Sequence, residues 1–183
     1  MRLDNEEYES IKQTVVDTFE QYKITTVPIS AFEMAIKMGL RIVPYSALSQ
    51  EKREAALRIS QDGFSIELHS GEWIIYYNDE CCIYGRINQT IMHEIGHYAL
   101  GHCKEGEQEE TEAKFFAKYA LAPPPLVHNM NKPVCINSLM DTFAISHEAA
   151  KYACIYYYNW LKYGDIQYTD YERKMMGLFS IAS

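Results

Sequence analysis

Apolar side chains recur along this chain with two different periods, and each period predicts a different kind of element. Spacings of three and four residues place side chains on one face of a helix. They predict helices over residues 4–23, 30–36, 49–57, 88–100, 110–121, 138–144 and 146–163. Strands are predicted over residues 40–45, 64–68 and 73–77, and turn residues between the last two predict a β-hairpin.

Residues with special backbone preferences mark where several of these helices begin and end. Ser30 and Ser146 stand at predicted N-caps, where a serine oxygen accepts a hydrogen bond from the first turn. Gly39 follows a predicted helix end, and three prolines at 123–125 close the helix before them. Neither a repeat nor a separating linker interrupts this order, which predicts one α+β domain.

The helix predicted over residues 88–100 contains the pattern His-Glu-x-x-His, formed by His93, Glu94 and His97. Residues four apart on a helix project from the same face. Both imidazoles can therefore be directed at one point about 2.0–2.1 Å from each nitrogen, as zinc requires. By itself the motif is only suggestive, because two solvated or hydrogen-bonded histidines on a surface helix would give the same pattern.

A catalytic zinc normally takes three protein ligands and one water, so a third ligand has to come from elsewhere. In the next predicted helix, Glu112 shares a face with three aromatic residues, and a carboxylate on a buried face is costly unless it is paired or binds metal. Glu109 on the same stripe is the spare candidate, and Glu110 is predicted to point elsewhere. Favourable interaction with the helix N-terminus explains Glu112 equally well. The residues alone leave both explanations open.

After the His-Glu-Ile-Gly-His of residues 93–97, residues 110–123 read Glu-Thr-Glu-Ala-Lys-Phe-Phe-Ala-Lys-Tyr-Ala-Leu-Ala-Pro. This sequence resembles the ImmA/IrrE family of metallo-endopeptidases, which typically shows Glu-x-Glu-Ala-Asn-x-Phe-Ala-x-x-Leu-Leu-Met-Pro after its own His-Glu-x-x-His. The likeness reaches back to residues 29–43 and forward to residues 139–150, so it covers most of the chain. Lys114 in place of the usual asparagine is one of a few mild departures.

The resemblance implies a zincin-like single domain with a small antiparallel or mixed sheet and an active-site helix. Residues 1–125 would form the sheet and the zinc-binding helices, and residues 126–183 a mostly helical extension packed on them. It implies that His93, His97 and Glu112 bind Zn²⁺ and that Glu94 is the catalytic base. Members of the family cleave a repressor often encoded nearby on a mobile element or stress locus. The expected partner is therefore a DNA-binding repressor on a separate chain.

Composition and charge narrow the remaining function classes. The 25 acidic and 17 basic residues give a net charge of -8, which repels phosphate backbones, so direct nucleic-acid binding is not expected. No stretch approaches the roughly 20 apolar residues that span a bilayer, and the N-terminal residues lack the apolar core of a signal peptide. We expect a cytoplasmic protein whose five cysteines are free thiols.

Several roles stay open at this level. Tyr98, Tyr119 and His128 are all candidates for a second oxyanion donor, and His102 is predicted to turn away from the ligand face. The strand over residues 73–77 would bind an extended substrate if it lay at the sheet edge, but pairing on both sides is equally compatible with its sequence.

A non-cleaving zinc-containing interaction module, such as an antitoxin or a sensor, would carry the same ligands as a peptidase. The intact Glu94 favours the enzyme, because a protein that only binds its partner has no need of a catalytic carboxylate.

Overall fold

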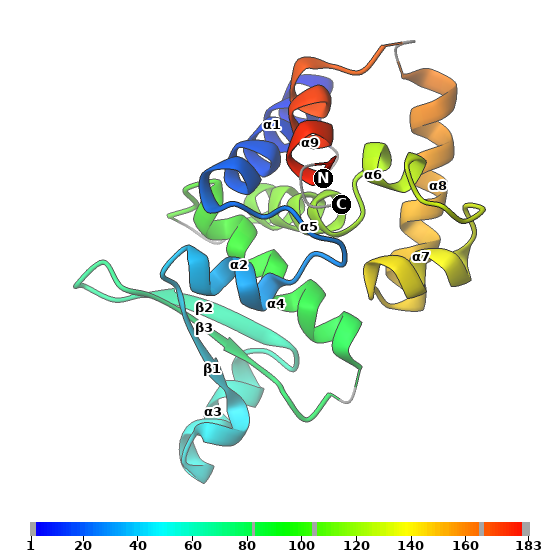
Figure 1. Ribbon diagram of the computed structural model, residues 1–183. Coiled ribbons are helices and arrows are strands. Elements are labelled where there is room, and N and C mark those ends of the chain that lie inside the picture. The colour runs from blue at the N-terminus through cyan, green and yellow to red at the C-terminus, as the bar shows by residue number, and fades with distance from the viewer. Residues whose placement is uncertain (1–2, 82, 104–105, 165–166, 181–183) are drawn as a thin grey trace.

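The structure is a computed structural model that describes residues 3–81, 83–103, 106–164 and 167–180. Its helices are α1 (Asn5–Tyr22), α2 (Ala31–Lys37), α3 (Gln50–Ile59), α4 (Tyr84–Ala99), α5 (Glu107–Leu121), α6 (Pro124–His128), α7 (Ile136–Phe143), α8 (His147–Tyr163) and α9 (Asp170–Ser180). Its strands are β1 (Arg41–Pro44), β2 (Gly63–Glu67) and β3 (Trp73–Tyr77), and a 3-10 turn covers Tyr45–Ala47. The fold is therefore α+β and mostly helical, with a small sheet (Figure 1).

The three strands form one mixed sheet in the order β1-β3-β2. β2 and β3 are antiparallel, which confirms the predicted hairpin, and β1 runs parallel to β3. Because β3 pairs on both sides, the alternative that placed residues 73–77 at the sheet edge is wrong. β1 and β2 occupy the two edges of the described sheet, and β2 packs against α4 together with β3.

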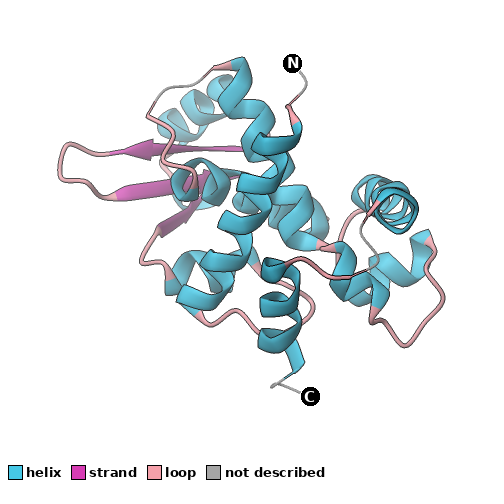
Figure 2. Cartoon of the chain, turned by 90° about the horizontal axis from the view of Figure 1, so that it is seen from above, coloured by secondary structure: helices cyan, strands magenta, loops and turns pink. Residues whose placement is uncertain are grey.

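The helices build a second layer around α4 and α5, which pack against each other (Figures 1 and 2). α1 covers α5 and also contacts α9, while α8 contacts α5, α6 and α7. Buried side chains from both layers form a common hydrophobic core, in which Ile75 of the sheet, Ile91 of α4 and Phe116 of α5 are fully buried. α4 and α5 thus lie between the sheet on one side and helices α1 and α8 on the other.

The predicted caps explain how several helices begin. The side chain of Ser30 accepts a hydrogen bond from the backbone of Glu33, and that of Ser146 accepts one from Ala149. Two helices were not predicted. α6 begins at Pro124, because a proline in the first turn of a helix loses no hydrogen bond, and α9 covers Asp170–Ser180 near the C-terminus. Within the described residues, no helix combines the length and the apolar composition required to cross a bilayer.

Gly85 in the first turn of α4 lies against the connection between α7 and α8. A Cβ at this position would be 2.6 Å from the backbone nitrogen of Ser146 and 2.8 Å from the carbonyl carbon of Ile145. Neither backbone atom can move away cheaply, so we expect Gly85→Ala to lower the free energy of unfolding by about 1–3 kcal/mol. Denaturant unfolding measures this difference.

The matched control is Gly177→Ala on the exposed side of α9, where no atom lies within 4 Å of the added Cβ. Alanine favours helix over glycine, so this variant should be unchanged or stabilised by up to about 1 kcal/mol. Equal unfolding free energies for the two variants would contradict the packing described for α4.

Candidate metal site

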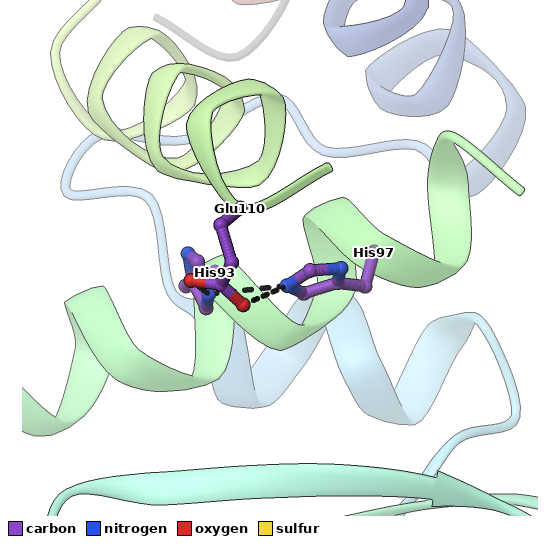
Figure 3. Close-up of side chains that lie close together, drawn as sticks. All are labelled: His93, His97 and Glu110. Carbon is purple, nitrogen blue, oxygen red and sulfur yellow. Dashed lines mark hydrogen bonds and ion pairs between the residues drawn. The ribbon is translucent and has the colours of Figure 1, made fainter. Parts of the chain in front are cut away.

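His93 and His97 lie one turn apart on α4 and point to the same side of the helix (Figure 3). Their Nε2 atoms are 3.2 Å apart. The two side chains are only 17% and 9% exposed, so they are not a solvated pair. The structure thus brings the two histidines together as the spacing predicted.

The carboxylate that completes this group belongs to Glu110 in the first turn of α5 (Figure 3). Its Oε1 is 3.2 Å from Nε2 of His97, and its Oε2 is 3.6 Å from Nε2 of His93. Among the described residues, the one group of three possible ligand atoms lying within 4.8 Å of one another is formed by His93, His97 and Glu110. The prediction that Glu110 points elsewhere is wrong.

Glu112, the expected third ligand, lies outside this group. Its Oε2 is 2.8 Å from Nε2 of His102, and its Oε1 accepts a hydrogen bond from the side chain of Gln108 at 3.0 Å. Gln108 in turn contacts Glu7 of α1. The structure therefore corrects the assignment of Glu112, whose carboxylate faces His102 and α1. The spare candidate Glu109 is not part of the group either.

The faces of α5 explain why the expectation chose the wrong glutamate. The aromatic residues used to place Glu112 do not all face one neighbour, since Phe115 contacts Tyr8 of α1 whereas Phe116 lies against Gly96 of α4. Ala113 lies on the side of α5 that packs against α4. Its Cα would be 3.3 Å from a Cβ built on Gly96, so the two helices approach closely here. Glu110 precedes Ala113 by three residues and so shares its face. Gly96 and Ala113, two small residues at which these helices could approach, were the signal in the sequence that could have indicated Glu110.

His102 lies closer to the site than its spacing predicted. α4 ends in a Schellman motif, in which the backbone N–H of Gly101 bonds to Tyr98 and that of His102 bonds to His97. Gly101 has φ +69°, a left-handed conformation that glycine adopts without strain. This reversal places Nδ1 of His102 3.0 Å from Nδ1 of His97. His102 therefore contacts the side of the His97 ring that faces away from Glu110.

Glu94 is 7% exposed and lines the same cleft as the three possible ligands. The hydroxyl of Ser65 on β2 donates a hydrogen bond to Oε2 of Glu94 at 2.6 Å. The cleft has a volume of about 790 Å³ and lies between β2, α4 and the start of α5. It is large enough to admit a segment of peptide next to the group, with Glu94 on its floor.

The electrostatic surroundings keep these groups in the protonation states that bind a cation. Burial and, to a smaller extent, the neighbouring His97 lower the pKa of His93 from 6.5 to about 4, although Glu110 opposes the shift. Burial opposes ionisation of Glu110, but His93, Lys114 and His97 together lower the pKa of its carboxyl. At neutral pH the site therefore presents a neutral imidazole at His93 and a carboxylate at Glu110.

Of the three candidates for a second oxyanion donor, none lines the described cleft. Tyr119 is 2% exposed in the helical core. The Nδ1 of His128 pairs with the hydroxyl of Tyr157 at 3.0 Å, and the ring of Tyr98 packs edge-on against Trp73. We therefore interpret all three side chains as residues that pack within the fold.

The donor set fits zinc in both chemistry and spacing. Zinc in proteins prefers histidine nitrogens, cysteine sulfurs and carboxylate oxygens. Ligand atoms placed tetrahedrally at about 2.0–2.1 Å from one ion lie about 3.3 Å from one another. The separations of 3.2, 3.2 and 3.6 Å among His93, His97 and Glu110 are close to this value.

Compared with models of known protein families, the chain matches none. No curated protein matches it significantly either. What the site can do therefore has to be argued from its geometry and from the sequence motif.

Proposed function

We propose that this protein is a zinc-dependent endopeptidase whose metal ligands are His93, His97 and Glu110. The observation that carries the proposal is the convergence of these three side chains in a cleft that also contains Glu94. Three protein ligands leave one position of a tetrahedral ion for water, which is the arrangement of catalytic rather than structural zinc. A site used only to stabilise the fold would be closed by a fourth protein ligand.

Each residue has a separate task in the proposed reaction. When bound here, zinc would polarise the scissile carbonyl and lower the pKa of a water molecule. Glu94 takes the proton from this water as general base and then passes it to the leaving nitrogen as general acid. Ser65 holds the Glu94 carboxylate in place through its 2.6 Å hydrogen bond, so the base does not have to be ordered during the reaction.

The position of β2 suggests how a substrate would be held. β2 forms one edge of the described sheet, and several of its residues line the cleft, among them Phe64 and Ser65. An extended peptide can add to such an edge through main-chain hydrogen bonds, which hold it with little regard to its sequence. From the sequence, this role was one of two alternatives for residues 73–77. Because β3 is paired on both sides, β2 is the strand for which we propose it.

The zincin-like character of the domain and its relation to the ImmA/IrrE family belong to this proposal. They are supported by the His-Glu-x-x-His pattern and by the similarity of residues 110–123 to the family's sequence. The natural substrate is then a DNA-binding repressor on a separate chain. This assignment rests on analogy, since a fold and a motif do not specify a substrate.

Metal content and proteolysis test the proposal together. The purified full chain should bind one zinc ion, and the double variant His93→Gln, His97→Gln should bind none at the same free zinc concentration. The zinc-loaded protein should cut a regulator encoded next to its own gene, and a chelator should stop the reaction. Bound zinc without any cleavage of the neighbouring regulators would support the alternative of a non-cleaving interaction module, and failure to bind zinc would refute the proposal.

A further inference from the structure

Glu67 at the end of β2 and Trp73 at the start of β3 both line the cleft, and the proposed reaction uses neither of them. The two residues are directly opposite each other in the antiparallel register of the hairpin, so their side chains lie on the same face of the sheet. Ser65, which holds Glu94, lies on that face as well, because it precedes Glu67 by two residues. The pair therefore borders the same space as the proposed catalytic base.

The hydrogen bonds of the hairpin show which backbone groups of β2 are directed at its free edge. The backbone N–H of Leu68 bonds to the carbonyl of Glu72 at 2.8 Å, immediately next to the opposed pair of Glu67 and Trp73. Hydrogen-bonded and non-hydrogen-bonded pairs alternate along two antiparallel strands. Ser65 and Glu67 belong to the second kind, so their backbone N–H and C=O groups point away from β3.

A peptide strand added to this edge would place one of its residues opposite Ser65 and another opposite Glu67. Opposed residues of neighbouring strands carry their side chains on the same face, so both substrate side chains would face the cleft. The two substrate residues would be two positions apart, which is roughly 6.6–6.8 Å along an extended chain. The first would lie next to Glu94, and the second would meet Glu67 and Trp73.

Glu67 carries a negative charge that no other described residue neutralises. Two further carboxylates of the cleft have cationic neighbours, since Asp62 lies 2.6 Å from Arg86 and Glu110 lies 3.3 Å from Lys114. Glu67 is exposed, and within the described parts of the chain its side chain takes part in no ion pair or hydrogen bond. A cationic ligand that also covered this carboxylate would displace the water that otherwise weakens the attraction.

Trp73 supplies an aromatic surface beside this carboxylate. Its Nε1 is buried, and its ring packs edge-on against Tyr98 with 5.5 Å between the centroids, so the indole N–H is not what Trp73 offers to a ligand. Lysine and arginine side chains combine a long apolar stem with a terminal cation. The stem packs against aromatic carbon, and the cation is attracted both by a ring face and by a carboxylate. The neighbouring Glu67 and Trp73 suit both parts of such a side chain.

The geometry points to Glu67 and Trp73 as specificity-determining residues, which form a subsite for a lysine or arginine side chain of the substrate. This side chain belongs to the residue two positions from the one next to Glu94. The inference rests on the proposed function, and it narrows the substrate class to extended peptides with a basic residue close to the cut bond. The net charge of -8 attracts such basic segments from a distance.

Binding of labelled peptides tests the subsite without requiring cleavage. The full chain carrying Glu94→Gln is titrated, with zinc present, with extended peptides of about eight residues, in which lysine, norleucine or glutamate occupies each position in turn. Fluorescence anisotropy measures the affinities. We expect one position at which lysine binds about 3–10-fold more tightly than norleucine, and glutamate more weakly than either. The advantage of lysine should shrink at high salt, because salt screens the attraction.

Two variants connect this preference to the pair. Glu67→Lys should reverse the order at that position, so that the glutamate peptide binds more tightly than the lysine peptide. Trp73→Leu keeps an apolar surface but has no ring, and it should reduce the advantage of lysine over norleucine.

Glu72→Lys is the matched control, since it changes the net charge by the same amount on the same hairpin, where Glu72 is exposed and outside the cleft lining. It should leave the preference unchanged. Equal affinities for lysine and norleucine at every position overturn the inference. A preference for lysine that survives Glu67→Lys overturns it too, as does a failure of every peptide to bind.

These outcomes are separable from failure of the proposed function. If lysine is preferred in a Glu67-dependent manner but the unsubstituted chain cuts nothing, the subsite stands and the peptidase proposal fails. If the unsubstituted chain cuts a neighbouring regulator while the peptides show no preference for a basic residue, only the subsite fails.

Discussion

Replacing Glu110 by alanine is expected to lower the zinc affinity of this protein by more than about a hundredfold, because it removes a direct ligand. Loss of an outer partner typically costs about 10–100-fold, and loss of a ligand should exceed it. Glu110 is the carboxylate whose oxygens lie 3.2 and 3.6 Å from the two Nε2 atoms. Competition with a chelator of known affinity measures the change, and metal analysis of the purified variant provides a second measurement.

Comparing the zinc affinities of the Glu110→Ala, Glu112→Gln and Glu109→Gln variants shows which of the three glutamates binds the metal. Glu112 contacts His102 rather than the histidine pair, so its substitution should weaken zinc binding less than that of Glu110. Glu109 belongs to neither group, and its substitution should have no effect. A larger loss for Glu112 than for Glu110 would restore the assignment made from the sequence and contradict the site described above.

Replacing Glu94 by glutamine is expected to abolish measurable cleavage while the bound zinc is retained. The amide has the shape of the carboxylate and can still accept a hydrogen bond from Ser65, so the cleft should keep its structure. It cannot take up a proton from water, and general acid–base catalysis contributes about 10²–10⁴-fold to such reactions. The rate of product formation from a cut regulator, measured at equal zinc loading, should fall by at least about a hundredfold.

Glu51→Gln provides the control for this variant, because Glu51 is exposed on α3 and is not among the residues that line the cleft. Its rate should match that of the unsubstituted protein. Normal cleavage by Glu94→Gln would remove Glu94 from the catalytic role, although the metal ligands would stand. Loss of zinc from this variant would show that Glu94 contributes to binding instead.

Much of the secondary structure could be predicted from local patterns. The strands at 64–68 and 73–77, the caps at Ser30 and Ser146 and most of the helices depend on neighbouring residues, whose spacing the sequence displays directly. The shared face of His93 and His97 belongs to this class, because a separation of four residues is one turn of helix whatever packs around it. The helices at Pro124 and Asp170 were not predicted, since short helices depend on packing more than on propensity.

The identity of the third carboxylate and the order of the strands were decided only by the tertiary structure. α5 has several buried faces, and an aromatic stripe indicates that a face is covered without indicating which helix covers it. The contact of Ala113 with Gly96 turns Glu110 toward α4, whereas Glu112 is left with His102 and α1. Likewise, no local sequence pattern shows that β3, the last strand in chain order, lies in the middle of the sheet.

The sequence by itself therefore determined which helix presents two imidazoles, whereas the residues of the following helix left open whether a carboxylate joins them. The packing of α4 on α5 decided which carboxylate that is, and the reversal at Gly101 decided that His102 returns to contact His97. The physical reason is the range of the interactions. Helical periodicity acts over four residues and is visible in the chain, but the rotation of one helix against another depends on the summed packing of side chains far apart in sequence.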